Sequence, residues 1–187
     1  MSRRWAWFVF TVLIVLSSGC GQSEIVPTGE AGTRMDIQIS STAFTDAGDI
    51  PQVYTCDGEN LSPPLAWKSV PEEAQSLALI VDDPDAPVKV WVHWVLYDLS
   101  PRLSNLPEGL ALGAELPSGG MQGKNDFNKF GYGGPCPPRG KAHRYYFTLF
   151  ALDQMLNLPA AATKTELENA MKGHIIAQGQ LIGKYGR

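Results

Sequence analysis

The sequence has few cysteines, no excess of basic residues and no apolar run long enough to cross a membrane. Its three cysteines include no C-x-x-C motif, which disfavours a thiol–disulfide redox centre and a zinc knuckle. Lysine and arginine number 15 against 19 acidic residues, so the formal net charge is −4 and nucleic acid is not an expected partner. The apolar stretch at residues 5–16 is shorter than the roughly 20 residues that a spanning helix needs.

The N-terminus has the pattern of an export signal. Two arginines precede the apolar stretch, and the small residues 17–19 come directly before Cys20. This cysteine resembles that of a bacterial lipobox, so we expect residues 1–19 to be a lipoprotein-type signal peptide and Cys20 to carry the lipid. A secreted protein without lipid and an uncleaved anchor are the alternatives. Because Gly21 follows, we expect an exported protein held on the periplasmic side of the outer membrane if the cell is Gram-negative.

Residues 20–34 are rich in Gly, Ser, Pro and Thr and predict a flexible tether, so the folded domain is expected at residues 35–187. Strand patterns recur at residues 35–39, 77–81, 91–97 and 143–152. Thr163 and Glu166 form a capping box that opens a helix, whose apolar face is predicted to continue to Ile175. We therefore expect a mainly β domain, a two-sheet sandwich with a few peripheral helices.

Two segments combine a histidine with proline-rich turns. Residues 83–87 (DPDAP) lead into the strand of His93, and residues 133–138 (GGPCPP) lead to His143. The two-residue period of a strand predicts that His93 shares a face with Val95. A buried core histidine is the simplest alternative for His93, but the preceding acidic turn raises the rank of a ligand-binding role.

The groups around these histidines suit a small anion. Asp83 and Asp85 could accept the ring N–H of His93 and fix its tautomer, or they could simply form the turn. The glycines before Pro135 allow backbone N–H groups to approach an anion closely. The sequence thus predicts a small preformed pocket for a phosphate-like or carboxylate group.

The cysteine count predicts one disulfide. With Cys20 set aside for lipid, Cys56 and Cys136 remain as an even pair in an oxidising compartment. They could close a loop of about 80 residues, worth roughly 3–5 kcal/mol in the chain-entropy model. Two buried free thiols are the alternative.

Catalytic motifs are absent from the two histidine segments. The sequence contains no G-x-S-x-G elbow, and no serine is placed by a recognisable motif beside either histidine. The histidines also lack the close spacing that presents a preassembled metal site. We therefore expect a binding protein with no cofactor and no metal.

Several motifs occur in an order that resembles one family. These are residues 54–60 (YTCDGEN), 83–87, the Trp91-x-His93 strand, residues 134–138, residues 143–145 (HRY) and residues 181–185 (LIGKY). Together they resemble the phosphatidylethanolamine-binding protein family, in its bacterial and archaeal Raf-kinase-inhibitor-like branch. The resemblance runs from about Met35 to Arg187.

This resemblance implies two packed sheets with an anion pocket at one end. The residues that it implies for the pocket are Asp83, Pro87, Trp91, His93, Gly134, Pro135, His143 and Tyr145. We expect His93 and His143 to donate hydrogen bonds to a phosphoryl-bearing ligand, with Asp83 orienting an imidazole and backbone donors near Gly134. We also expect tighter binding on acidification, since imidazolium donates two hydrogen bonds.

Two other functions remain open from the sequence. The domain could be a protein-interaction module, such as a protease inhibitor or an envelope regulator, whose partner the sequence does not identify. It could also be a hydrolase or isomerase that uses His/Asp acid–base chemistry. Non-enzymatic binding of a small anion by a lipid-anchored domain is the function that we predict.

Overall fold

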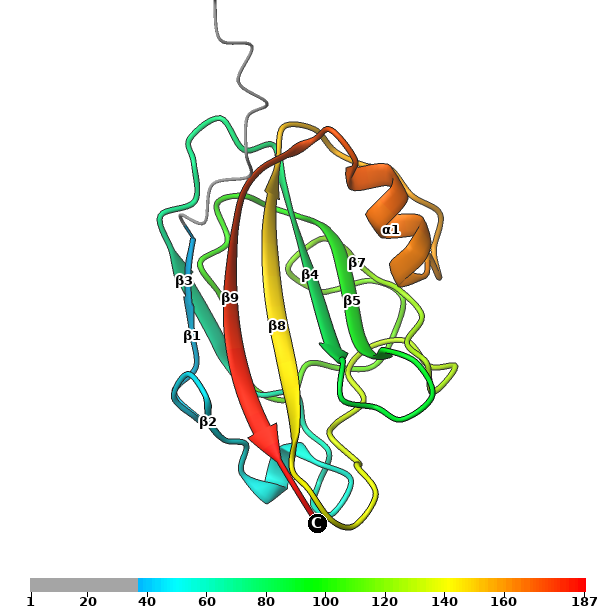
Figure 1. Cartoon of the computed structure of the whole chain (residues 1–187). Helices are drawn as coiled ribbons and strands as arrows, with labels where there is room; N and C mark the ends of the chain where they lie inside the picture. Colours follow the sequence, from blue (N-terminus) through cyan, green and yellow to red (C-terminus); the bar gives the residue numbers. More distant parts are fainter. Residues whose placement is uncertain (1–36) are drawn as a thin grey trace, which may run out of the picture. The chain divides into compact units, whose positions relative to one another are not determined.

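Alternating apolar residues build two β-sheets, which the computed structural model describes over residues 37–187 (Figure 1). The larger sheet has the strand order β2-β9-β8-β4-β5-β7, and the smaller has the order β1-β3-β6. The larger sheet comprises β2 (Gly48–Asp49), β4 (Ser76–Asp83), β5 (Trp91–Leu99), β7 (Met121–Gln122), β8 (His143–Leu152) and β9 (Ile175–Tyr185). The smaller comprises β1 (Gln38–Ser40), β3 (Leu65–Lys68) and β6 (Asn105–Leu106). All pairings are antiparallel except that of β2 with β9.

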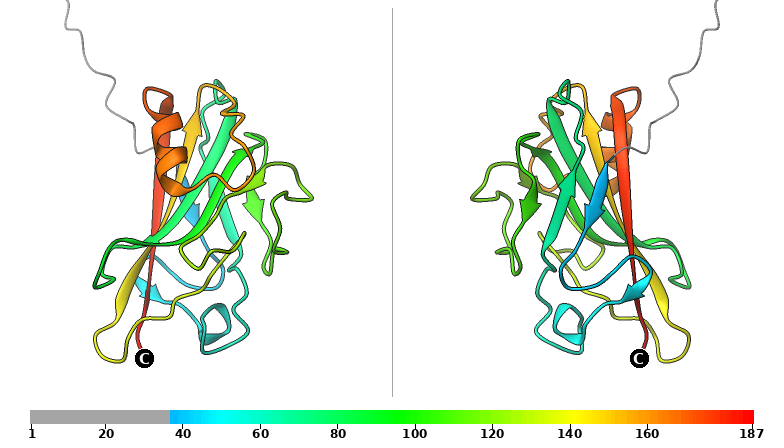
Figure 2. Two further views of the ribbon diagram at one scale, coloured as in Figure 1. Left: turned by 90° about the vertical axis from the view of Figure 1, so that its right-hand side faces the viewer. Right: turned by 90° about the vertical axis from the view of Figure 1, so that its left-hand side faces the viewer.

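Two apolar layers cover the faces of the larger sheet. One layer lies between the sheets and includes Trp67, Trp94 and Phe147. The other includes Tyr97 and lies beneath the α-helix α1 (Lys164–Met171) (Figure 2). Burial of this area is the main favourable term of folding. The predicted mainly β, two-sheet fold is confirmed.

The helix that the sequence predicted after Thr163 is present but shorter than expected. Besides α1, residues 37–187 contain only a 3₁₀ turn, η1 (Gln52–Tyr54). Thr163 caps α1, and its reciprocal bonds with Glu166 confirm the capping box. The predicted continuation to Ile175 is wrong, because the helix ends at Met171 and Ile175 already begins β9.

A bulge in β5 alters the predicted faces of that strand. Val81 pairs with Trp94, but the next residue of β4, Asp82, pairs with Val92. His93 is therefore the extra residue that β5 has at this bulge. His93 then contacts the Tyr145 ring on the inter-sheet side, whereas Val95 packs in the layer beneath α1. The prediction that His93 and Val95 share a face is therefore wrong. The bulge re-aims the imidazole, a common role of bulges beside binding sites.

The predictions for the N-terminus concern a different part of the chain. The signal peptide at residues 1–19, Cys20, the tether at residues 20–34 and the domain start at residue 35 all lie outside the described residues. Within residues 37–187, no helix is long and apolar enough to span a membrane.

Candidate anion-binding site

A cavity of about 310 Å³ lies at one end of the larger sheet. Strand β4 ends there, and β5 and β8 begin there, in the lower part of Figure 1. Antiparallel pairing brings these ends together, since Asp83 pairs with Trp91 and its neighbour Asp82 pairs with Tyr146. The residues lining the cavity are Asp83, Ala86, Pro87, Val88, Lys89, Trp91, His93, Phe127, Cys136, Pro137, Pro138 and His143.

One imidazole is held by a carboxylate. The Nδ1 atom of His143 lies 2.7 Å from Asp83 Oδ2, and the Asp83 side chain is almost fully buried. The other oxygen, Oδ1, accepts from the backbone N–H of Asp85, which fixes the carboxylate. Because a carboxylate accepts, Nδ1 carries the proton and Nε2 is the ring atom left for a ligand. Asp83 thus orients His143, and the prediction that it orients His93 is wrong.

The second imidazole is held by the backbone. His93 Nδ1 donates to the carbonyl of Gly133 at 2.5 Å, and the N–H of Gly133 donates to the carbonyl of His93 at 2.9 Å. Burial lowers the pKa of His93 below its ordinary value, although the Gly133 carbonyl and the Asp83 carboxylate oppose this shift. The ring is therefore neutral at neutral pH and presents the lone pair of Nε2.

The hydroxyl of Tyr145 is buried and makes no well-formed hydrogen bond among residues 37–187, although the Asp83 carboxylate lies near it. The Tyr145 ring meets the His93 ring edge-on, with 5.1 Å between centroids. Burial raises the pKa of Tyr145, and the negative charge of Asp83 contributes, so the hydroxyl keeps its proton. An unpaired buried hydroxyl costs roughly 1–3 kcal/mol, and a ligand oxygen would relieve that cost. Tyr145 lies behind His93 rather than among the lining residues.

One wall of the cavity is aromatic. Trp91 and Phe127 meet edge-on at 5.4 Å between ring centroids, and Phe127 also lies 5.5 Å from the His93 ring. Val88 stands at the cavity with 93% of its surface exposed. The sequence did not indicate Phe127, because it lies in an irregular connection that has no periodicity. This wall favours a ligand with an apolar group next to its charged one.

Asp85 is not part of the cavity. Its carboxylate binds Arg144 through both oxygens, at 2.8 Å to Nε and 2.7 Å to Nη2. The hydrogen bond from Arg144 is the main cause that lowers the pKa of Asp85 to about 2. The predicted ligand-binding role of Asp85 is therefore not supported, because its acceptors face the guanidinium.

The two glycines do not form the predicted anion cradle. The N–H of Gly134 already donates to Asn60 Oδ1 at 2.7 Å, and that of Gly133 donates to His93. A Cβ on Gly134 would lie 2.4 Å from the Tyr54 carbonyl, so glycine is needed here for packing. Neither Gly134 nor Pro135 lines the cavity.

Two other backbone donors are better placed than those of the glycines. Ala86 and Cys136 both line the cavity, and their N–H groups have no acceptor within the described part of the chain. The sequence analysis did not single out either residue as a donor. Cys136 is joined to Cys56 in a disulfide with 5.4 Å between Cα atoms. The disulfide thus ties a wall of the cavity to the turn after η1.

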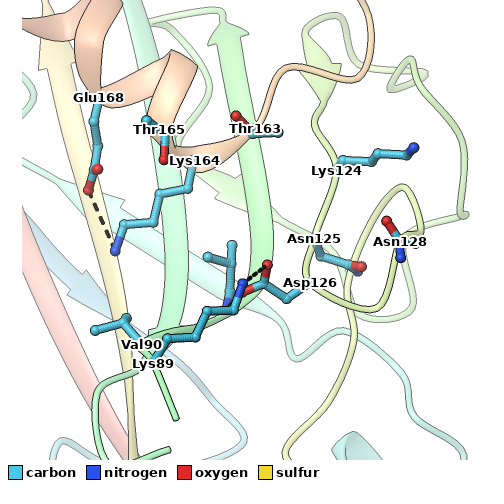
Figure 3. A pocket seen from close by; sticks show the side chains of 11 residues that line it. Lys89, Val90, Lys124, Asn125, Asp126, Asn128, Thr163, Lys164, Thr165 and Glu168 are labelled. Carbon is cyan, nitrogen blue, oxygen red and sulfur yellow. Dashed lines mark hydrogen bonds and ion pairs between the residues drawn. The ribbon is translucent and has the colours of Figure 1, made fainter.

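A larger cavity of about 600 Å³ lies on the far side of the Phe127 loop, between that loop and the start of α1 (Figure 3). Four of the five charged side chains that line it are paired. Lys89 lies 2.7 Å from Asp126, and Lys164 pairs with both Asp82 and Glu168, whereas Lys124 has no ion pair among residues 37–187. The smaller cavity instead holds two imidazoles whose rings are fixed by Asp83 and Gly133. The smaller cavity is therefore the candidate site.

Metal ligation is not indicated by the geometry. Within the described range, no group of three or more His, Cys, Asp and Glu residues is arranged to hold a metal ion.

Comparisons with known proteins identify relatives over this whole domain. The family model described as phosphatidylethanolamine-binding protein matches residues 40–186. A UPF0098 protein of Methanothermobacter thermautotrophicus is 52% identical over 151 residues, which cover 81% of this chain and 99% of the relative. A UPF0098 protein of Aquifex aeolicus is 46% identical, over 81% of this chain and 89% of the relative.

Solved structures give the same result. A crystal structure from Chlamydia trachomatis, described as that of a phosphatidylethanolamine-binding protein homologue, superposes with a TM-score of 0.74 at 45% identity, covering 81% of this chain and 98% of that one. Escherichia coli YbcL, described as a member of the mammalian PEBP family, gives 0.75 at 31% identity, covering 81% and 99%.

Proposed function

Since the chain belongs to the phosphatidylethanolamine-binding protein family, we propose that it binds a small phosphoryl-bearing anion, without catalysis, in the cavity between His93 and His143. The observation that carries this proposal is the His143 imidazole at the cavity, which the buried Asp83 carboxylate holds through Nδ1 so that Nε2 is left for a ligand. Membership of the family supports a ligand-binding protein. The nature of the ligand is argued from the groups at the cavity.

The donors at the cavity suit the oxygens of an anion. Ala86 and Cys136 line the cavity and offer backbone N–H groups that have no acceptor among residues 37–187, and the buried hydroxyl of Tyr145 lies beside His93. His143 Nε2 is also left for a ligand, because Asp83 already holds Nδ1. Hydrogen bonds to charged acceptors are worth roughly 1.5–3 kcal/mol each. These groups together can hold the oxygens of a phosphoryl group.

The same arrangement supports binding without turnover. A hydrolase would need a nucleophile beside the His143–Asp83 pair. Among the described residues, one cysteine, Cys136, lines the cavity. Its sulfur is bonded to that of Cys56 and so cannot act as a nucleophile. The described lining also contains no serine or threonine.

Calorimetric titration with phenyl phosphate tests the proposal. Its ring matches the wall of Trp91 and Phe127, and its phosphoryl group matches the donors. We expect saturable binding that weakens about tenfold or more in His143→Asn. Lys124→Met is the matched control, because Lys124 lines only the larger cavity. Absence of binding by the wild type, equal weakening in both variants, or steady release of phenol would overturn the proposal.

We also infer that the domain works while anchored to the cell envelope by lipid on Cys20. Support comes from the sequence alone, in which the apolar stretch ends in Ser-Ser-Gly-Cys. Cells fed a palmitate analogue should label the wild-type protein and leave Cys20→Ala unlabelled. Equal labelling of the two proteins would contradict the lipid anchor.

A further inference from the structure

The candidate site contains a hydrogen-bond acceptor as well as donors, so a ligand must supply a donor of its own. His93 Nδ1 must carry its proton, because its partner, the Gly133 carbonyl, can only accept. The neutral ring therefore has a lone pair at Nε2, the ring nitrogen that the Gly133 carbonyl leaves unengaged. His93 is 2% exposed and lines the cavity, so a bound ligand shields Nε2 from water.

A fully ionised oxygen placed against this lone pair would be repelled. An unpaired acceptor facing an anion loses its hydrogen bond to water and gains nothing in return. A ligand that carries both acceptor oxygens and one O–H donor satisfies the backbone N–H groups of Ala86 and Cys136 together with His93 Nε2. A phosphate monoester in its singly protonated form has this combination, whereas its dianion and a sulfate monoester have no proton to donate.

We propose that the site selects phosphate monoesters in the singly protonated form, with His93 Nε2 accepting the hydrogen bond of the P–O–H group. This inference rests on the proposed function. His93 is then a specificity-determining residue, and the geometry of its bond to Gly133 sets its role. Burial also opposes protonation of the ring, which keeps Nε2 an acceptor. No proton is transferred in this step, since the P–O–H bond stays intact.

The ionisable groups around His93 define the competing explanation for any pH dependence. Asp82 and Asp83 face it from the end of β4, Tyr145 and His143 from β8, and Lys89 lines the same cavity. The second pKa of a phosphate monoester is about 6, so the dianion predominates at pH 7.5. Protonation of a histidine would strengthen the binding of any anion on acidification. Protonation of the ligand would strengthen only that of a phosphate.

Phenyl phosphate and phenyl sulfate are a matched pair of probes for this difference. Calorimetry on the whole mature chain should show phenyl sulfate binding at least about tenfold more weakly than phenyl phosphate at pH 5.5. The affinity for phenyl phosphate should fall by up to about tenfold per pH unit above pH 6, while that for phenyl sulfate changes little. In His93→Gln the amide can donate or accept, so the preference for phosphate should shrink severalfold.

Phosphorus NMR on the wild type makes the test independent of how His93→Gln folds. We expect bound phenyl phosphate to keep the chemical shift of the monoanion at pH 7.5, where the free ligand shows that of the dianion. A dianion shift for the bound ligand, or equal affinity for the two probes, would overturn the selection while leaving anion binding intact. Failure of both probes to bind would instead overturn the proposed function.

Discussion

His143 Nδ1 lies 2.7 Å from Asp83 Oδ2, although 60 residues separate the two in the sequence. This contact joins the end of β4 to the start of β8 and sets which nitrogen of His143 faces the cavity. The neighbouring Asp85 makes an equally short contact, but with Arg144 outside the cavity. Asp83 therefore orients a ring at the cavity, whereas Asp85 forms an ion pair outside it, and the first prediction distinguishes these two roles.

Asp83→Asn should weaken the binding of phenyl phosphate by about tenfold or more, because it removes the buried charge that orients the His143 ring. Asp85→Asn should change the affinity less than about threefold, since an exposed ion pair contributes little. Calorimetric titration of the two variants side by side makes the measurement. Equal losses would mean that the turn acts as one structural unit.

Removal of the disulfide should destabilise the domain. The bond between Cys56 and Cys136 closes a loop with a sequence separation of 80, so the chain-entropy model predicts a loss of about 4 kcal/mol in the double Cys→Ala variant. Urea unfolding gives the free energy, and non-reducing mass spectrometry of the exported protein should show the cross-linked peptides. Freely alkylated thiols in the exported protein would refute the pairing.

Stability should fall as the pH is lowered, and His93 should account for part of the fall. Burial holds the folded-state pKa of His93 below its ordinary value near 6.5, so the unfolded chain takes up a proton first. The stabilisation is present above pH 6.5 and is lost as the pH falls from there through the folded-state pKa. Urea unfolding at pH 7.5 and pH 5.5 should give a smaller difference for His93→Gln than for the wild type. The same difference in both proteins would contradict the assignment.

The sequence predicted the regular parts of the site better than its irregular parts. The strand pattern at residues 143–152 correctly predicted β8, which has no irregularity before its last two residues. The two-residue period of a strand failed for His93, since a bulge is a property of two paired strands and leaves no mark in one of them.

Long-range polar partners were also beyond prediction. Gly134 was expected to face an anion, but its N–H is taken by Asn60, 74 residues away. Asp85 was expected at the cavity, but Arg144, 59 residues away, holds its carboxylate. Several acceptors were compatible with each donor in the sequence, and only the folded chain selects one of them.

The hydroxyl of Tyr145 offers the most direct test of an anion site, because it is buried beside His93 and makes no well-formed hydrogen bond in the described chain. In Tyr145→Phe, removal of an unsatisfied buried group should leave the free energy of unfolding of the free protein unchanged or slightly higher. Its affinity for phenyl phosphate should nevertheless fall by about tenfold or more. The measurement is a calorimetric titration of the wild type and Tyr145→Phe, together with urea unfolding of both without ligand. Weaker binding by a variant of undiminished stability is the predicted result, and an unchanged affinity would contradict the account.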